Sequence, residues 1–209
     1  MDRDFVRHWV FMNFLGAGLG GAVAPLGTQA LQHLTSGQPD NATQLPRLVV
    51  FLSLMIIGAL EGAVIGALQT RSLRQRFTTL NVRRWITLTS SGFVWGWLLN
   101  AFTNTGVDSM PTSTAWLWVV VGTQGMLLGV CVGGIQAWLL RHDLSRPLHW
   151  VGLTTLGWTC ALVAQSIAQD LIPPTLDGPL WIAATAVTGS VGGFILGALT
   201  GPWLDQATR

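Results

Sequence analysis

The chain has 209 residues, of which 50% are hydrophobic and only 10% are charged, and its formal net charge is +2. Ordinary soluble domains carry about 25% charged residues, and a soluble protein of this size needs a more highly charged surface. The composition therefore excludes a soluble domain and predicts a polytopic membrane protein. Its basic character comes from 11 arginines without any lysine, which we interpret as a sign of membrane topology rather than of nucleic-acid binding.

Six apolar segments are long enough to cross a membrane, which takes about 20 apolar residues. They are Phe5–Leu31, Leu48–Thr70, Trp85–Thr103, Ala115–Leu140, Trp150–Ile172 and Leu180–Leu204. The connections between them contain polar and turn-forming residues, as at 36–40 and 173–178. The sequence therefore predicts an all-α membrane protein with six transmembrane helices in a single transmembrane domain, 1–209.

The arginines are divided unevenly between the two sides of this predicted membrane domain. If all six segments cross, one side receives only Arg47 and the other receives the remaining arginines. These are Arg3, Arg7, Arg71, Arg74, Arg76, Arg83, Arg84, Arg141, Arg146 and Arg209. Because basic residues concentrate on the cytoplasmic side, we expect both termini to be cytoplasmic.

Each even-numbered span carries glycine at every fourth position, three times in succession. We call these sets the glycine ladders: Gly58, Gly62 and Gly66; Gly125, Gly129 and Gly133; and Gly189, Gly193 and Gly197. Residues four apart lie on one face of a helix, and glycine on that face lets another backbone approach closely in a membrane. We therefore assign the ladders to helix packing, near the middle of the bundle.

The odd-numbered spans carry a second pattern, in which a basic residue and a tryptophan precede two small residues. The tryptophans are Trp9, Trp85 and Trp150; a glycine follows seven residues later, and a small residue four beyond that. Because the two patterns alternate three times, we predict three tandem two-helix hairpins, at approximately 5–72, 83–141 and 148–205. Hairpins with an even number of spans share one orientation, so we expect a pseudo-threefold axis along the membrane normal.

Glu61 is the only glutamate, and it lies far inside the second span, where the other repeats hold Leu128 and Gly192. An ionisable group at this depth is costly unless it is neutralised or paired, which makes it a functional candidate by default. Two interpretations remain open. One is a structural hydrogen bond across the bundle, and the other is a site for a transported ion or a ligand. The candidate hydrogen-bond partners are Asn100, Gln124, Gln165 and backbone carbonyl groups.

Polar residues recur near the predicted cytoplasmic ends of two even spans. Gln69 and Gln136 occupy equivalent positions, and Arg74 and Arg141 follow each of them after five residues. Such a cluster could bind an anionic headgroup or ligand. Alternatively, the arginines stabilise the negative ends of the helix dipoles, and we favour this second interpretation.

The repeated tryptophans stand where the odd spans enter the membrane. Tryptophan prefers the interface, with its ring among the headgroups and its indole N–H near water. We therefore expect Trp9, Trp85 and Trp150 to form an anchoring belt.

Catalytic and metal-binding patterns are not recognisable. His8, His33, His142 and His149 fall at span ends or in loops, and Cys131 and Cys160 lie in apolar spans without C-x-x-C spacing. Walker, zinc-protease and hydrolase motifs are absent from suitable contexts. The sequence thus implies no enzyme activity, metal or cofactor, and it leaves a pigment or a lipid open as a ligand.

The Gly-x3-Gly-x2-Gln-x4-Arg ends at 62–74 and 129–141, followed by a basic-Trp entry, resemble uncharacterised integral membrane proteins of cyanobacteria and some other bacteria. The resemblance covers most of the chain and rests mainly on glycine spacing. It implies six spans in a bacterial inner membrane, either plasma or thylakoid, and brings no established activity.

Two functional hypotheses follow. The first is a non-enzymatic accessory or assembly subunit of a larger membrane complex, photosynthetic or respiratory, with lipid and other membrane subunits as partners. The second is a small-solute or ion transporter, channel or substrate-binding subunit that uses Glu61. We favour the first, because polar residues along the spans are too few for a water-lined pathway. A lipid-modifying membrane enzyme is the weakest alternative.

Overall fold

The structure is a computed structural model that describes residues 2–35, 45–104, 114–173, 176 and 178–207. Secondary structure in these ranges is helical, which confirms the predicted all-helical class. The helices are α1 (Arg3–Thr35), α2 (Leu45–Leu73), α3 (Val82–Asn104), α4 (Thr114–Leu139), α5 (Pro147–Asp170) and α6 (Gly178–Ala207). Each predicted span falls within one of them, except at the ends of the fourth and fifth spans, where the helix is one or two residues shorter.

Within the described ranges, four helices have stretches long and apolar enough to cross a membrane. They are Phe51–Leu73 in α2, Trp118–Leu139 in α4, Pro147–Asp170 in α5 and Gly178–Ala207 in α6. Helices α1 and α3 begin with charged residues, such as Arg7 and Arg84, and carry more polar side chains. The chain therefore has the character of a membrane protein with four clearly apolar spanning helices.

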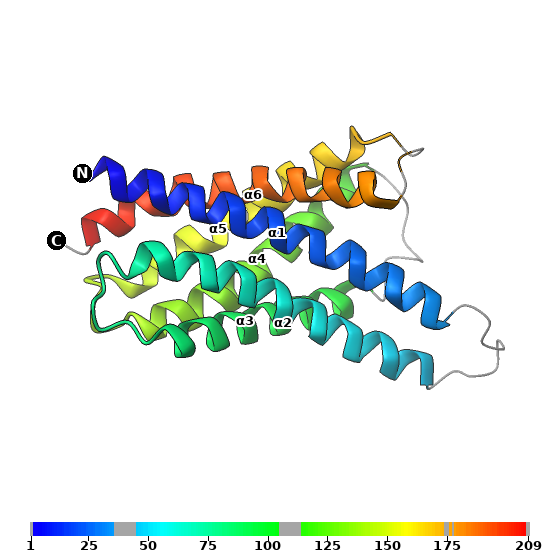
Figure 1. Cartoon of the computed structure of the whole chain (residues 1–209), viewed down its shortest axis with the longest axis horizontal. Helices are drawn as coiled ribbons and strands as arrows, with labels where there is room; N and C mark the ends of the chain where they lie inside the picture. The colour runs from blue at the N-terminus through cyan, green and yellow to red at the C-terminus, as the bar shows by residue number, and fades with distance from the viewer. Residues whose placement is uncertain (1, 36–44, 105–113, 174–175, 177, 208–209) are drawn as a thin grey trace.

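The six helices pack in a closed ring. Each helix contacts its neighbours in the sequence, and α6 closes the ring by packing against α1. Helix α1 begins and α6 ends at the same end of the bundle, where the α2–α3 and α4–α5 connections also lie (Figure 1). We call this the arginine-rich end, because these connections, the end of α2 and the start of α3 carry most of the arginines, from Arg71 to Arg84 and from Arg141 to Arg146.

The glycine ladders lie at contacts between neighbouring helices of the ring. A Cβ atom on Gly62 of α2 would lie 2.6 Å from the Cα atom of Ser90 in α3. On Gly125 of α4 it would lie 2.5 Å from the Cα atom of Thr159 in α5. Because real Cβ contacts are essentially never this short, these glycines allow the backbones to touch.

The third ladder makes the same kind of contact with the first helix. A Cβ atom on Gly197 of α6 would lie 2.8 Å from the Cα atom of Val10 in α1, and one on Gly193 would overlap the Asn13 carbonyl oxygen. Each ladder therefore packs on the odd-numbered helix that follows it around the ring. The ladders lie between neighbouring helices rather than facing one another across the bundle.

The small residues of the odd helices form the other contacts of the ring. Gly16 of α1 faces Ile65 of α2, and a Cβ atom added to this glycine would lie 3.3 Å from the Ile65 Cα atom. The corresponding glycines, Gly92 and Gly157, face Val132 of α4 and Leu196 of α6. Both faces of each odd helix are therefore in close contact with an even helix.

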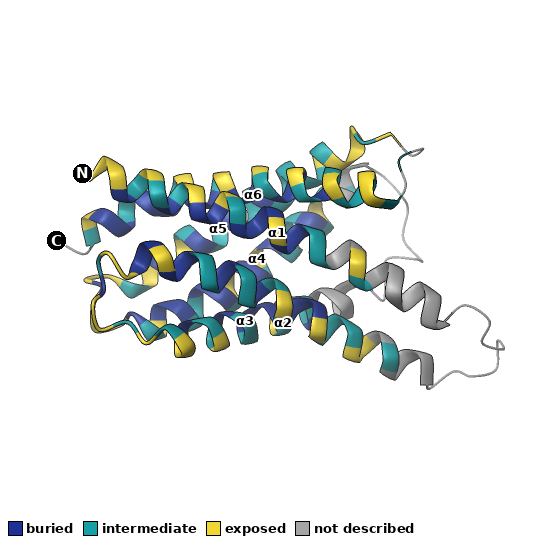
Figure 2. Ribbon diagram, viewed as in Figure 1, coloured by how far each residue is buried: buried dark blue, intermediate teal, exposed yellow. Residues whose placement is uncertain are grey.

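Two clusters of buried apolar side chains fill the space enclosed by the ring. The cluster at the arginine-rich end consists of Phe5, Trp9, Leu73, Phe77, Trp85, Ala137, Leu140, Leu144, Trp150 and Leu204. The second, deeper cluster consists of Ile65, Phe93, Leu128, Val132, Trp158, Ala161 and Leu196. Buried and exposed positions alternate along each helix in Figure 2, as expected for helices with one inward and one outward face.

Candidate functional site at the arginine-rich end

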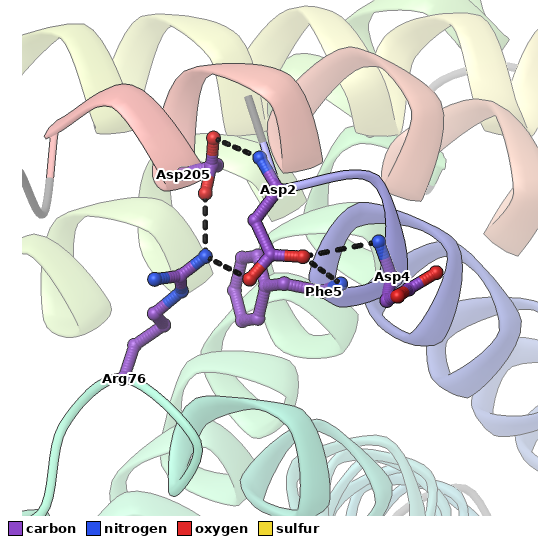
Figure 3. Close-up of polar contacts among 5 residues, drawn as sticks. All are labelled: Asp2, Asp4, Phe5, Arg76 and Asp205. Carbon is purple, nitrogen blue, oxygen red and sulfur yellow. Dashed lines mark hydrogen bonds and ion pairs between the residues drawn. The ribbon is translucent and has the colours of Figure 1, made fainter.

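An ion-pair cluster joins three distant segments at the arginine-rich end (Figure 3). Arg76, in the α2–α3 connection, donates hydrogen bonds of 2.7 Å to carboxylate oxygens of both Asp2 and Asp205. Asp205, in the last turns of α6, is fully buried and also accepts a hydrogen bond of 3.0 Å from the backbone N–H of Asp2. A buried carboxylate is stable only when it is paired in this way, and this pairing joins the start of α1 to the end of α6.

Asp2 has a second role as the N-cap of α1. Its other carboxylate oxygen accepts hydrogen bonds of 3.1 Å from the backbone N–H groups of Asp4 and Phe5. The Arg76 guanidinium also lies 4.8 Å from the centre of the Phe5 ring. The start of α1 is therefore held by capping, by charge and by a cation–π contact.

A buried polar network crosses the bundle at least one helical turn deeper than the ion-pair cluster. Gln136 of α4 donates to the side-chain oxygen of Gln69 in α2 (3.1 Å), and Gln69 donates to that of Asn13 in α1 (3.0 Å). Gln136 also donates to the Thr89 hydroxyl (3.3 Å), and Asn13 donates to the Trp9 carbonyl (2.9 Å). Since α2 and α4 are not neighbours in the ring, the Gln136–Gln69 bond joins helices across its interior.

This network involves corresponding positions of the three predicted hairpins. The residues four after the tryptophans are Asn13, Thr89 and Thr154, and those three after the ladders are Gln69, Gln136 and Thr200. All six side chains are buried, and we call them the polar ring. Satisfied buried hydrogen bonds of this kind specify one arrangement of the helices.

The third hairpin contributes to the polar ring through a different bond. The Trp9 indole N–H donates to the Thr200 hydroxyl, at 2.9 Å, and Thr200 itself donates to the Leu196 carbonyl. In the part of the chain that the structure describes, Trp85 Nε1, Trp150 Nε1 and the Thr154 hydroxyl are buried without a hydrogen-bond partner. The three corresponding tryptophans are thus all buried, but only the Trp9 indole N–H has a hydrogen-bond partner among them.

The interpretation of Trp9, Trp85 and Trp150 as an anchoring belt is wrong. Their exposed fractions are only 1%, 0% and 1%, and Trp9 packs edge-on against Trp150 with ring centres 6.0 Å apart. The three rings belong to the buried cluster on the inward face of the bundle, where they fill the space between the helices. They are core residues at the arginine-rich end.

Glu61 has a partner that the sequence did not indicate. Its carboxylate accepts a hydrogen bond of 2.8 Å from the indole N–H of Trp97 in α3. On the other side it faces α1, where a Cβ atom on Gly20 would lie 2.9 Å from the Glu61 Cγ atom. Glu61 is therefore partly buried and lies between α1 and α3.

The structure describes two of the three amide side chains that were proposed as partners of Glu61. Gln124 and Gln165 are both partly buried, and Gln124 makes interactions of its own. The side chain of Asn100 lies outside the described residues.

The arginines that follow the two glutamines lie apart from them. Gln69 and Gln136 are 3% and 1% exposed, whereas Arg74 and Arg141 lie on the surface. Arg141 packs its guanidinium on the ring of Trp138, 5.0 Å from the ring centre, and Arg74 lines a groove of about 470 Å³ with Arg71 and Gln75. The predicted cluster is thus two layers, with amides inside and arginines outside.

Several residues of the site were missed by sequence reasoning. Asn13 and Thr89 could have been found, because they recur four residues after the repeated tryptophans. Arg76 and Asp205 gave no comparable signal, since their contact depends on how the chain ends meet. Trp97 was hidden because a tryptophan in an apolar span is ordinary.

Metal-binding arrangements are not found in the described part of the chain, where no group of three or more His, Cys, Asp or Glu side chains converges. Cys131 and Cys160 are free thiols, each partly buried. His8 instead forms hydrogen bonds with Ser72 (2.8 Å) and Gln75 (3.2 Å) at the end of α2.

Comparison with known proteins adds no relative: no family model, no curated protein and no solved structure matches this chain.

Proposed function

We propose that this chain is a non-enzymatic integral membrane protein that serves as an accessory or assembly subunit of a larger membrane complex, photosynthetic or respiratory. The observation that carries the proposal is the filled interior of the helix ring. Phe93 and Trp158 meet there edge to face, with ring centres 5.2 Å apart, and four members of the polar ring are bonded to one another: Asn13, Gln69, Thr89 and Gln136. Such an interior suits a rigid building block.

The finer architecture is part of the proposal. We infer six membrane-spanning helices in three hairpins, related by a pseudo-threefold axis along the membrane normal. Support comes from the glycine contacts, which repeat around the ring: α2 on α3, α4 on α5 and α6 on α1. In this arrangement Glu61, Leu128 and Gly192 are corresponding residues, and each faces the second small residue of its own hairpin: Gly20, Gly96 and Ala161, respectively.

The membrane and its orientation are also proposed. We place the chain in a bacterial inner membrane, plasma or thylakoid, with the arginine-rich end in the cytoplasm. The support is the positive-inside distribution, together with the position of α1's start and α6's end beside the two arginine-carrying connections (Figure 1). The partners are then membrane lipid and other membrane subunits.

The test compares a variant that disturbs helix packing with variants that leave the packing intact, one of which removes the Glu61 charge. Gly129→Leu places a side chain where the backbone of Thr155 lies, whereas Gly134→Leu on the same helix meets open space. We expect Gly129→Leu to abolish incorporation into the native complex, and Gly134→Leu and Glu61→Gln to leave it intact. The measurement is the size of the particle that carries each variant on a native gel.

The alternative is a transporter, channel or substrate-binding subunit that uses Glu61. The observation in its favour is a carboxylate enclosed within a span, which receives the Trp97 indole N–H on one of its two oxygens. If Glu61→Gln kept the native particle but abolished a solute or ion flux into vesicles, this alternative would replace the subunit proposal.

A further inference from the structure

The outer surface at the arginine-rich end carries a basic groove beside an exposed tryptophan. The groove has a volume of about 510 Å³ and is lined by Asn81, Arg83, Arg84, Thr87, Leu88 and Trp138. It lies where the start of α3 packs against the end of α4. Both arginines are exposed, and Trp138 is 47% exposed, so the groove opens away from the interior of the bundle.

Trp138 contacts two arginine side chains beside this groove. The guanidinium groups of Arg84 and Arg141 lie over its ring, 4.8 and 5.0 Å from the ring centre. These cation–π contacts hold two long side chains in place without neutralising either charge. The start of α3 adds the partial positive charge of a helix N-terminus, although Asn81 already accepts one of its N–H groups, that of Arg84.

Carboxylates of the described residues do not pair with the arginines of the groove. In the described ranges, the ion pairs formed by arginine involve Arg76, with Asp2 and Asp205. Arg141 uses its Nε–H in a 3.0 Å hydrogen bond to His142, which leaves its terminal N–H donors available. Arg83 and Arg84 thus line the groove with positive charge, and Arg141 adds a third guanidinium on the ring of Trp138, one of the lining residues.

We propose that this groove binds the phosphate headgroup of an anionic membrane phospholipid. Guanidinium groups match phosphate oxygens in geometry and charge, and a tryptophan with arginines at the membrane interface lies at the depth of the headgroups. A lipid is favoured over a soluble phosphate because the two helices that form the groove carry further exposed apolar side chains, Trp95 of α3 (57%) and Val130 of α4 (52%). An acyl chain can contact such side chains while its phosphate contacts Arg84.

The test is a lipid-retention measurement on the purified full-length chain. Protein in detergent is offered equal amounts of phosphatidylglycerol and phosphatidylcholine, and the retained lipid is counted by native mass spectrometry. The wild type should retain one phosphatidylglycerol with a preference of about tenfold or more, since each basic residue near a headgroup contributes about fivefold. Arg84→Gln with Arg141→Gln should remove most of the preference, and Trp138→Leu should weaken it severalfold.

Matched control variants distinguish a specific lipid-binding site from general attraction of lipid to surface charge. Arg7→Gln removes one exposed arginine from the same end, and Phe11→Leu removes an exposed aromatic ring from α1; both should keep the preference. If the double arginine variant fails to fold, the lipid preference of Arg84→Gln alone is measured instead. The proposal is overturned if the wild type retains both lipids equally, if Arg7→Gln acts like Arg84→Gln, or if millimolar inorganic phosphate displaces the lipid.

Discussion

Single residues show how the bundle is closed at one end. Asp205 is fully buried, yet it is a charged side chain in the last turns of α6, and its charge is balanced by Arg76 from a connection far away in the sequence. Arg76 is only 24% exposed, so solvent does little to weaken the pair. A single arginine thus ties the start of α1, the end of α6 and the α2–α3 connection together.

We predict that Arg76→Gln strongly destabilises the protein. The change removes the positive partner of the buried Asp205 carboxylate, which keeps the Asp2 N–H as a donor; losing one partner of a buried ion pair typically costs about 3–5 kcal/mol. The measurement is the apparent melting temperature in detergent, followed by size-exclusion chromatography. The control is Arg74→Gln, which removes an exposed arginine from the same segment and should change the melting temperature little. Equal melting temperatures for the two variants would show that the Asp205 pair is unimportant.

A second residue-level prediction concerns the polar ring. Gln136→Leu deletes the donor to both Gln69 and Thr89 and leaves two buried polar groups with one partner fewer. We expect a loss of about 1–3 kcal/mol of stability, seen as a lower melting temperature in detergent. Gln165→Leu, at a partly buried site outside the ring, is the comparison variant. A Gln136→Leu protein as stable as wild type would mean that the network is dispensable.

Pairs of helices are held together by backbone contact at glycine. Hydrophobic burial gives little net attraction between helices in a membrane, because lipid tails are as apolar as the side chains. Close approach at the ladders compensates by bringing more atoms into contact. The α6–α1 interface is the clearest case, since Gly193 lies directly on the Asn13 carbonyl group.

We therefore predict opposite outcomes for two glycine-to-alanine changes. Gly193→Ala pushes α6 away from α1 and should destabilise the bundle by about 1–3 kcal/mol, as overpacking does elsewhere. Gly122→Ala on α4 meets nothing within 4 Å and should be neutral or slightly stabilising, because alanine favours the helix. Thermal stability in detergent compares them. If both variants melt alike, the close contact does not contribute to stability.

Elements were easier to predict from the sequence than the contacts between their side chains. Apolar length predicted the helices, because it depends on local composition, whereas glycine spacing did not predict which neighbouring helix each ladder contacts. The tryptophans were misinterpreted because their position along the chain is the same for an interfacial anchor and for a core residue. Which side of the helix faces inward decides between the two roles, and that depends on the partner helices.

In the candidate site, too, individual residues were easier to predict than the contacts between them. Gln69 and Gln136 were found as corresponding residues, but their mutual bond across the ring follows only from the assembled bundle. Glu61 stood out by its charge, while its partner Trp97 could not be chosen among many residues of the third helix. The ion pair of Arg76 joins segments separated by most of the chain, and no local pattern encodes it.

The molecule as a whole should place both termini and two connections on one side of the membrane. In a chain with Cys131 and Cys160 replaced by alanine, we predict that Asp143→Cys is labelled only from the cytoplasm and Asp40→Cys only from the opposite side. A membrane-impermeant thiol reagent applied to intact cells and to inside-out vesicles measures this. Labelling of both positions from the same side would rule out the six-span arrangement.

The subunit proposal is tested most directly by gentle detergent extraction from the native membrane. The extract would be sized on a native gel, its absorption spectrum recorded, and the co-migrating proteins identified by mass spectrometry. We predict that this chain migrates in a large assembly with other membrane subunits, and the spectrum would show whether that assembly holds a pigment. A small colourless particle that contains only this chain would contradict the proposal and direct attention to Glu61 and transport.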